Sequence, residues 1–103
     1  MKRKVEYIYH RVMRSLHTHT RLPLHALTKS RSATAVLCRV VLVTTLLQLG
    51  ITEPSIQRAS GWSQQRVNHI KNHTAPKHLN TLECRILRRQ VWNEVSYLKR
   101  DED

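Results

Sequence analysis

The sequence predicts an all-α fold of five or six helices, and three observations lead to this prediction. Apolar residues recur at spacings of three and four, which is the period of an α-helix and not of a strand. Glycine and proline are scarce, with two and three residues, which disfavours a turn-rich sheet protein. Serine and threonine, which cap helices, stand before several apolar stretches. The 103 residues fit one domain over 1–100, followed by an acidic tail over 101–103.

The first third of the chain predicts two helices and a basic connector. Residues 3–16 carry an apolar face, and basic residues from Lys2 to Arg14 lie around it. The spacing breaks after position 16, and Pro23 suits the first turn of a short helix over 24–28. The connector that follows, T-K-S-R-S, is basic and polar.

A long apolar stretch predicts a central helix. Ser32 is its expected N-cap, and Gly50 is a natural residue to end it. Residues 35–51 are strongly apolar, but they are barely long enough to span a membrane and they include Arg39. We therefore expect a helix that is buried on most sides and no membrane partner.

The second half of the chain predicts three more helices. Thr52 caps the first, Gly61 breaks it, and Ser63 caps the second. Residues 73–77, which include a proline, are expected to form a connector. A final long helix from about position 80 is marked by the apolar residues Leu82, Ile86, Leu87, Val91, Val95 and Leu98.

The charge points to a polyanionic partner. Eighteen basic residues against seven acidic ones give a formal net charge of +11. Such an excess favours nucleic acid first and an acidic protein or membrane surface second. Cys38 and Cys84 fall among apolar neighbours, as reduced core residues of a cytoplasmic, nucleoid-associated protein would. The basic start of the chain is not followed by the apolar segment of a secretion signal.

Residues 52–72 have the organisation of a helix-turn-helix. Ile56 and Ala59 of its first helix, and Val67 and Ile70 of its second, are expected to face the core. Trp62 in the turn is expected to pack beneath the second helix. The opposite face of that helix offers amide, hydroxyl and basic side chains, which are the groups that bind base edges and phosphates in DNA. Double-stranded DNA is therefore the expected partner.

Residues 1 to about 73 resemble the C-terminal DNA-binding domain of the bacterial replication initiator DnaA, which shares its core with the Trp repressor. Four features follow in the order of that family: a leading amphipathic helix, the segment L-H-A-L-T-K-S-R-S, the segment V-L-C-R-V-V, and a helix-turn-helix whose second helix ends R-V-N-H-I. Two features depart from it. The turn sequence G-W-S-Q-Q-R is one residue shorter than the family's, and a final helix is added.

The resemblance implies roles for particular side chains. Arg31 would enter the minor groove of the DNA, and Arg39 would contact the DNA backbone. The residues that contact bases in the major groove would lie at the start of the second motif helix. An arginine in so apolar a helix needs a partner, and a DNA phosphate, Glu53 or a carbonyl group would each serve. The candidate DNA-binding residues are Lys29, Arg31, Arg39, Ser63, Gln64, Gln65, Arg66, Asn68, His69 and Lys71.

Catalytic, metal and cofactor sites are not expected. The carboxylates are few and scattered, and no Gly-rich phosphate loop of an ATPase occurs. Seven histidines include the pairs His17/His19 and His69/His73, but no cysteine pair accompanies them at zinc-finger spacing. We expect a stand-alone DNA binder, a monomer or a homodimer, that regulates transcription or replication, for example of a phage or mobile element. The alternative is a basic helical module that binds an acidic protein or membrane surface.

Overall fold

The structure, a computed structural model, describes residues 4–100. Within that range it contains helices and no strand, which confirms the all-α prediction. The expectations for Lys2 and for the acidic tail over 101–103 lie outside the described residues. The elements are α1 (Val5–Thr20), α2 (Leu24–Lys29), α3 (Ala33–Gln48), α4 (Glu53–Ser60), α5 (Gln64–His69), the π-helical turn η1 (Ile70–Thr74), α6 (Ala75–His78), α7 (Leu82–Val95) and the 3-10 turn η2 (Ser96–Leu98).

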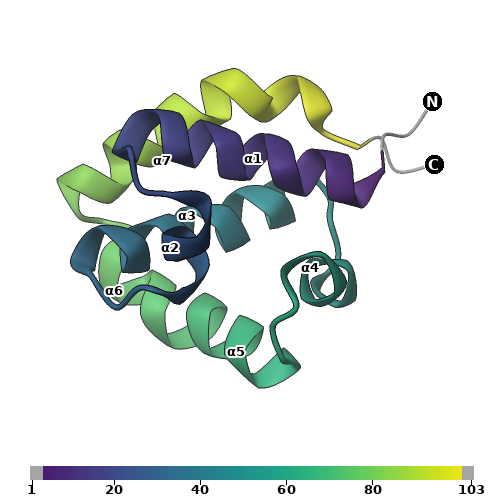
Figure 1. Ribbon diagram of the computed structural model, residues 1–103, viewed down its shortest axis with the longest axis horizontal. Helices are drawn as coiled ribbons and strands as arrows, with labels where there is room; N and C mark the ends of the chain where they lie inside the picture. The colour runs from purple at the N-terminus through teal and green to yellow at the C-terminus, as the bar shows by residue number, and fades with distance from the viewer. Residues whose placement is uncertain (1–3, 101–103) are drawn as a thin grey trace.

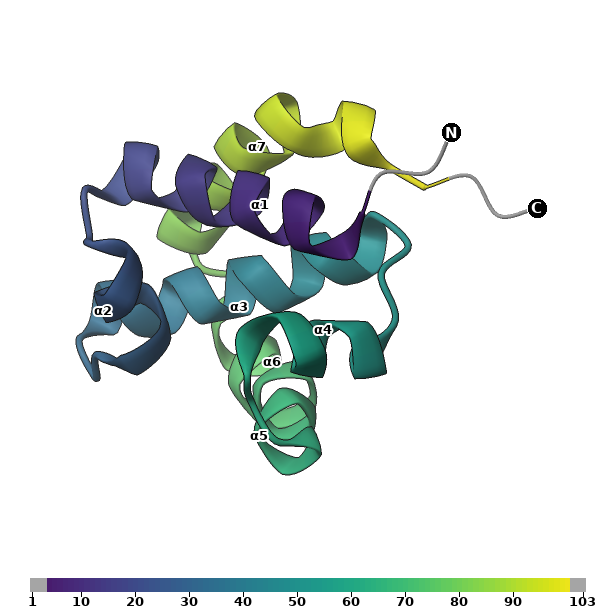
Figure 2. The same ribbon diagram turned by 45° about the vertical axis from the view of Figure 1, so that its right-hand side comes forward.

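The central helix α3 lies between two groups of helices, which meet where α4 packs on α1 (Figures 1 and 2). On one side, α1 and α7 pack against each other and against α3. On the other side lie α4, α5 and α6, with η1 and α6 packed on α3. The short helix α2 packs on α3 and α1 at one end of the molecule. Helix α4 packs on α1 as well as on α3, whereas α5 and η1 lie on the side of α3 away from α1 and α7.

The position of α3 explains its composition. Val40, Val41 and Leu42 follow one another along the chain and are all buried, as a helix covered on most sides requires. Cys38 is buried in the same helix, and Cys84 is buried in α7, as the sequence predicts. Among residues 4–100, no helix combines the length and the apolar character that crossing a membrane demands.

Short polar side chains begin four of the helices. The hydroxyls of Ser32, Thr52 and Ser63 accept hydrogen bonds from backbone N–H groups three residues later, at 3.2, 3.4 and 3.1 Å. These three caps are the ones that the sequence predicts. Thr81 does the same for α7 at 3.3 Å. Each cap satisfies an N–H group that the first turn of a helix would otherwise leave without a partner.

The first helix is longer than predicted. The apolar spacing ends at Leu16, but α1 continues to Thr20. Its last turn extends beyond the core, so His17, Thr18 and His19 are exposed and need no apolar face. The helix ends where Arg21 adopts a left-handed conformation, with φ of 62°.

A hydrogen-bonded cluster joins the end of α1 to α7. Ser15 Oγ donates to Glu94 Oε1 at 2.5 Å, and His19 Nε2 lies 2.8 Å from the same oxygen. The hydrogen bond from Ser15 is the main reason that the pKa of Glu94 is lowered, and His19 lowers it further. The cluster favours the ionised carboxylate where the two helices meet.

The connector predicted over 73–77 is helical, so that prediction is wrong. Helix α5 continues through η1 into α6, which gives an unbroken helical path over 64–78. The Ala75 amide bonds to the Ile70 carbonyl, five residues earlier, and so widens the turn just before Pro76. In a regular α-helix the ring of Pro76 would clash with the carbonyl four residues earlier. The wide turn interrupts the α-helical hydrogen-bond pattern at this point, so the chain continues as a helix.

The final helix buries a different face from the predicted one. Leu87, Val91, Val95 and Leu98 are buried, in agreement with the prediction, and Cys84 joins them. Leu82 and Ile86 were expected in this stripe, but they are 67% and 49% exposed. The positions that face α1 and α3 begin at residue 84, so residues 82 and 86 lie on the outer side of α7.

Candidate nucleic-acid interface

The helix-turn-helix is formed by α4 and α5, which are joined by Gly61, Trp62 and Ser63. Gly61 has a φ of 77°, a left-handed conformation that favours glycine, and its N–H bonds to the Gln57 carbonyl at 2.8 Å. Ser63 caps α5 two residues later. The chain therefore reverses in three residues, which is the tight turn that the motif requires.

The inner face of the motif is packed as predicted. Ile56, Val67 and Ile70 are buried, and Ala59 is partly buried against the same core. Trp62 is only 9% exposed, so it packs as the sequence predicts. The packing fixes α5 against the rest of the domain, and the opposite face of α5 is left to solvent.

The outer face of α5 and η1 presents amide and imidazole groups. Gln64, Gln65 and His69 are exposed, and Asn68 is partly exposed. A shallow groove runs along this face and is lined by Gln65, Asn68, His69, Asn72 and His73. These positions repeat at spacings of three and four, so they form one continuous stripe, the reading face.

Asn72 and His73 are the two residues of the reading face that the sequence analysis missed. The motif predicted from the sequence ends at residue 72, because a proline such as Pro76 normally ends a helix. The imidazoles of His69 and His73 stack with centroids 5.2 Å apart, which shows how η1 continues the face of α5. The spacing of Gln65, Asn68 and His69, continued by one turn, would have found both residues.

Two arginines hold the C-terminal end of α2. Arg39 Nη1 donates to the carbonyls of Ser30 at 2.7 Å and Leu27 at 3.3 Å. Arg66 Nη2 donates to the Thr28 carbonyl at 2.9 Å. We call this pair the arginine clamp. It supplies positive charge to the end of a helix where unpaired carbonyls make the potential negative.

Arg39 binds backbone carbonyls, which are one of the three kinds of partner considered for it. Its guanidinium binds carbonyls of α2 and the connector, and it makes no contact with Glu53. Burial lowers the pKa of Arg39, and the nearby positive charge of Arg66 lowers it further. Arg39 is thus partly buried, and its guanidinium is hydrogen-bonded within the protein without DNA.

Arg66 has structural contacts in addition to its place on α5. Its guanidinium carbon lies 5.2 Å from the centroid of the Trp62 ring, within the range of a cation–π interaction. Together with the bond to Thr28, this contact connects the turn, the start of α5 and the end of α2. The bond to Thr28 joins α5 to the residue at which the basic connector begins.

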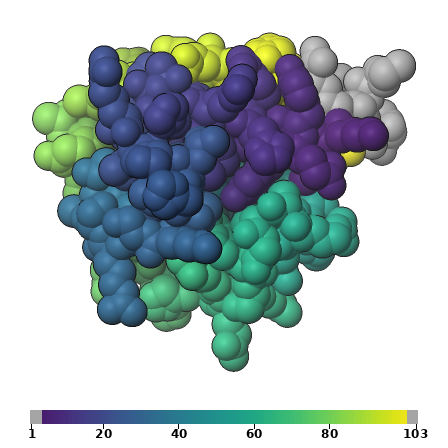
Figure 3. All heavy atoms as spheres, in the orientation of Figure 1, coloured from purple at the N-terminus to yellow at the C-terminus, as the bar shows by residue number. Residues whose placement is uncertain are grey.

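The connector carries two exposed basic residues. Lys29 and Arg31 are exposed, and neither side chain makes a hydrogen bond or ion pair with the described residues. Figure 3 shows the chain around the connector, in blue, and the helix-turn-helix, in green, on the same lower side of the molecule. The basic connector and the helix-turn-helix therefore lie on one side of the molecule.

Two other predicted residues take part in the fold. Lys71 Nζ lies 3.4 Å from Glu53 Oε2, an ion pair between η1 and the start of α4. Ser63 uses its hydroxyl oxygen to accept the hydrogen bond from Arg66 N. Lys71 remains 43% exposed, so its ammonium group is still accessible to a further anion.

Metal ligands do not gather in the part of the chain that the structure describes. Between residues 4 and 100 there is no group of three or more His, Cys, Asp or Glu side chains placed to hold an ion. His69 and His73 stack against each other without a third candidate ligand.

Comparison with known proteins gives no relative. No protein-family model matches the chain, and neither the curated proteins nor the solved structures include a match.

Proposed function

We propose that this protein binds double-stranded DNA in a sequence-dependent manner, with the reading face in the major groove. The observation that carries the proposal is the stripe of Gln65, Asn68, His69, Asn72 and His73 along one exposed helical face. Amide side chains form paired hydrogen bonds with adenine in the major groove, and that groove is wide enough to admit an α-helix.

The distribution of charge supports the same partner. Lys29 and Arg31 stand beside the reading face without partners among residues 4–100, where phosphates or a flanking minor groove would lie. Carboxylates are absent from the lining of the groove. A net charge of +11 adds long-range attraction to a polyanion.

The arrangement that we propose follows the DnaA-like resemblance in part. Arg31 enters the minor groove that flanks the major-groove site, and a narrow groove over A·T pairs attracts it most strongly. Arg39 and Arg66 act indirectly, because they hold the connector that carries Arg31. The protein is then a regulator of transcription or replication that works without ATPase activity.

Duplex binding is tested by fluorescence anisotropy over a range of salt concentrations. About five phosphate contacts predict a slope of log affinity against log salt of roughly −4 to −5. A flat slope would contradict the electrostatic part of the proposal.

A competition experiment separates DNA binding from a general affinity for anions. Duplexes selected from a random pool should compete at least tenfold better than unselected duplex. An acidic polypeptide or anionic vesicles that displaced the duplex equally well would favour a basic interaction module instead.

A further inference from the structure

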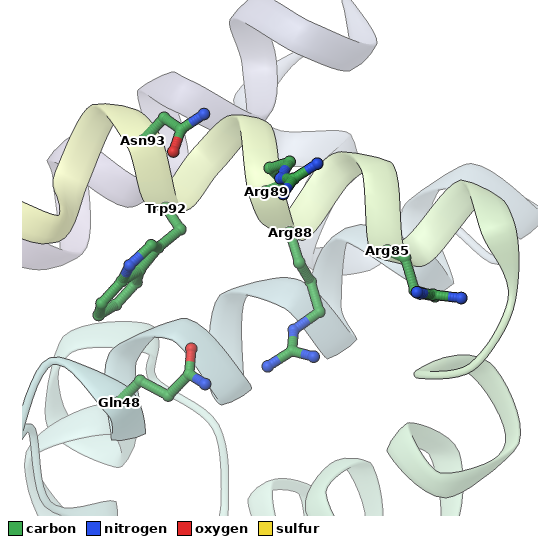
Figure 4. A pocket seen from close by; sticks show the side chains of 6 residues that line it. All are labelled: Gln48, Arg85, Arg88, Arg89, Trp92 and Asn93. Atoms are coloured by element: carbon green, nitrogen blue, oxygen red, sulfur yellow. The ribbon is translucent and has the colours of Figure 1, made fainter.

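A second basic region lies away from the reading face, between the end of α3 and α7. A hollow of about 470 Å³ is lined by Gln48, Arg85, Arg88, Arg89, Trp92 and Asn93. Figure 4 shows the side chains of Arg88 and Trp92 leaving α7 on the same side as Gln48 of α3, with Arg85 at the edge. The volume is in the range of small-molecule sites.

The charge in this hollow is not balanced by the described residues. Arg88 and Arg89 stand three and four residues after Arg85 on α7, so three positive charges line the same hollow and repel one another. No acidic residue stands three or four positions from any of them. Their side chains make no hydrogen bond or ion pair within residues 4–100, and Arg88 Nε is buried without a partner. Such a group is stabilised by an anion that accepts from several guanidiniums.

The aromatic side chain narrows the class of anion. Trp92 follows Arg88 by one helical turn and is partly buried against the core. A tryptophan beside arginines can stack on a planar ring while the arginines bind a phosphate. Gln48 adds an amide group that can bond to the edge of such a ring. Bases inside a duplex stack on one another, so an aromatic platform favours an unpaired base.

We propose that the hollow between α3 and α7 binds a nucleotide. Its phosphate lies against Arg85 and Arg88, with Arg89 adding positive charge at the rim, and its base stacks on Trp92. A free nucleotide and an unpaired nucleotide of a nucleic-acid strand share this chemistry. The inference is independent of the proposed duplex binding, because none of these residues belongs to the reading face or the connector.

The test uses the fluorescence of Trp92. The chain has two tryptophans, so Trp62→Phe leaves Trp92 as the single source of tryptophan emission. Adenosine monophosphate should quench this emission in a saturable way. Adenosine, which lacks the phosphate, should bind at least tenfold more weakly, and inorganic phosphate should compete only weakly because it has no base. Equal binding of nucleotide and nucleoside, or no quenching at all, would overturn the proposal.

Variants identify the site. Arg88→Gln and Arg85→Gln should each weaken nucleotide binding at least tenfold, whereas Arg14→Gln, an exposed arginine on α1, should not. Calorimetric titration of the chain with both tryptophans gives the same comparison if Trp62→Phe or Arg88→Gln disturbs folding. Equal affinities of the Arg85 and Arg14 variants would refute the site.

Two further measurements separate the sources and the two proposals. A phosphorylated tetrathymidylate that binds more tightly than thymidine monophosphate assigns the site to a strand, and the reverse assigns it to a free nucleotide. Arg85→Gln should leave affinity for a duplex within about twofold, and Gln65→Ala should leave nucleotide binding unchanged. A nucleotide site that depends on Gln65 would refute the separate hollow, whatever the duplex result.

Discussion

Replacing Arg39 by methionine tests whether this arginine supports the fold or contacts DNA. Methionine keeps an unbranched apolar stem and a good helix propensity, and it removes the guanidinium. The change breaks the bonds to the Ser30 carbonyl at 2.7 Å and the Leu27 carbonyl at 3.3 Å. The carbonyls at the end of α2 are then left with water or with no partner.

The magnitude follows from the shorter bond. A hydrogen bond to a charged group contributes about 1.5–3 kcal/mol, whereas a bond at 3.3 Å is beyond the usual distance and adds little. The same burial that lowers the pKa of Arg39 also makes the charge costly, which offsets part of this gain. A net loss of about 2 kcal/mol is expected, and in a chain of this size it lowers Tm by roughly 8 °C or more.

The assay is thermal unfolding followed by circular dichroism, without DNA. Arg31→Met is the matched control, because Arg31 is exposed and is expected to leave Tm unchanged. If Arg39→Met unfolds at the wild-type temperature but binds duplex with a shallower salt slope, the guanidinium contacts phosphate and the clamp is refuted as its main role.

Three further predictions concern the reading face, the α1–α7 contact and the thiols. Gln65→Ala should weaken binding to a preferred duplex by about 1–3 kcal/mol with Tm unchanged, and an equal loss on random duplex would show that Gln65 does not discriminate bases. Glu94→Gln should destabilise the protein at neutral pH. The lowered pKa of Glu94 gives a stability that is present above its ordinary value of 4.5 and is lost as the pH falls through the folded value, so urea unfolding of variant and wild type should converge in acid. A difference independent of pH would contradict this account. Cys38 and Cys84 are buried, and burial raises the pKa of both thiols, so Ellman's reagent should react only after denaturation; rapid reaction of the native protein would refute their burial.

The helix-turn-helix could be predicted because its determinants are local. Thr52 and Ser63 cap their own helices, and Gly61 provides the left-handed turn between them. The inward positions Val67 and Ile70 follow from helical spacing alone. Each of these effects acts within a few residues, so a local sequence pattern is enough to predict the motif.

The continuation of α5 could not be predicted in this way. Pro76 normally ends a helix, and only the π turn before it allows the chain to continue. That turn is packed on α3, so it depends on contacts that no local pattern contains. The consequence for the site is that Asn72 and His73 join the reading face.

The partners of the clamp also required the structure. Arg39 and Arg66 are 27 residues apart in the sequence, and both bind backbone carbonyls near the end of α2. Backbone carbonyls carry no sequence information, so a local pattern cannot identify them as partners. The exposure of Leu82 and Ile86 has a similar cause, because the face that α7 buries is set by α1 and α3.

Hydroxyl-radical footprinting on a selected duplex tests the central claim most directly. Wild type should protect the backbone around one major-groove site and an adjoining A·T-rich minor groove. Arg31→Ala should lose the flanking protection and keep the central protection, while Gln65→Ala should weaken the central protection. If the selected duplex is not protected, or if Arg31→Ala and wild type give the same pattern in the flanking groove, the proposed docking of the connector and α5 is contradicted.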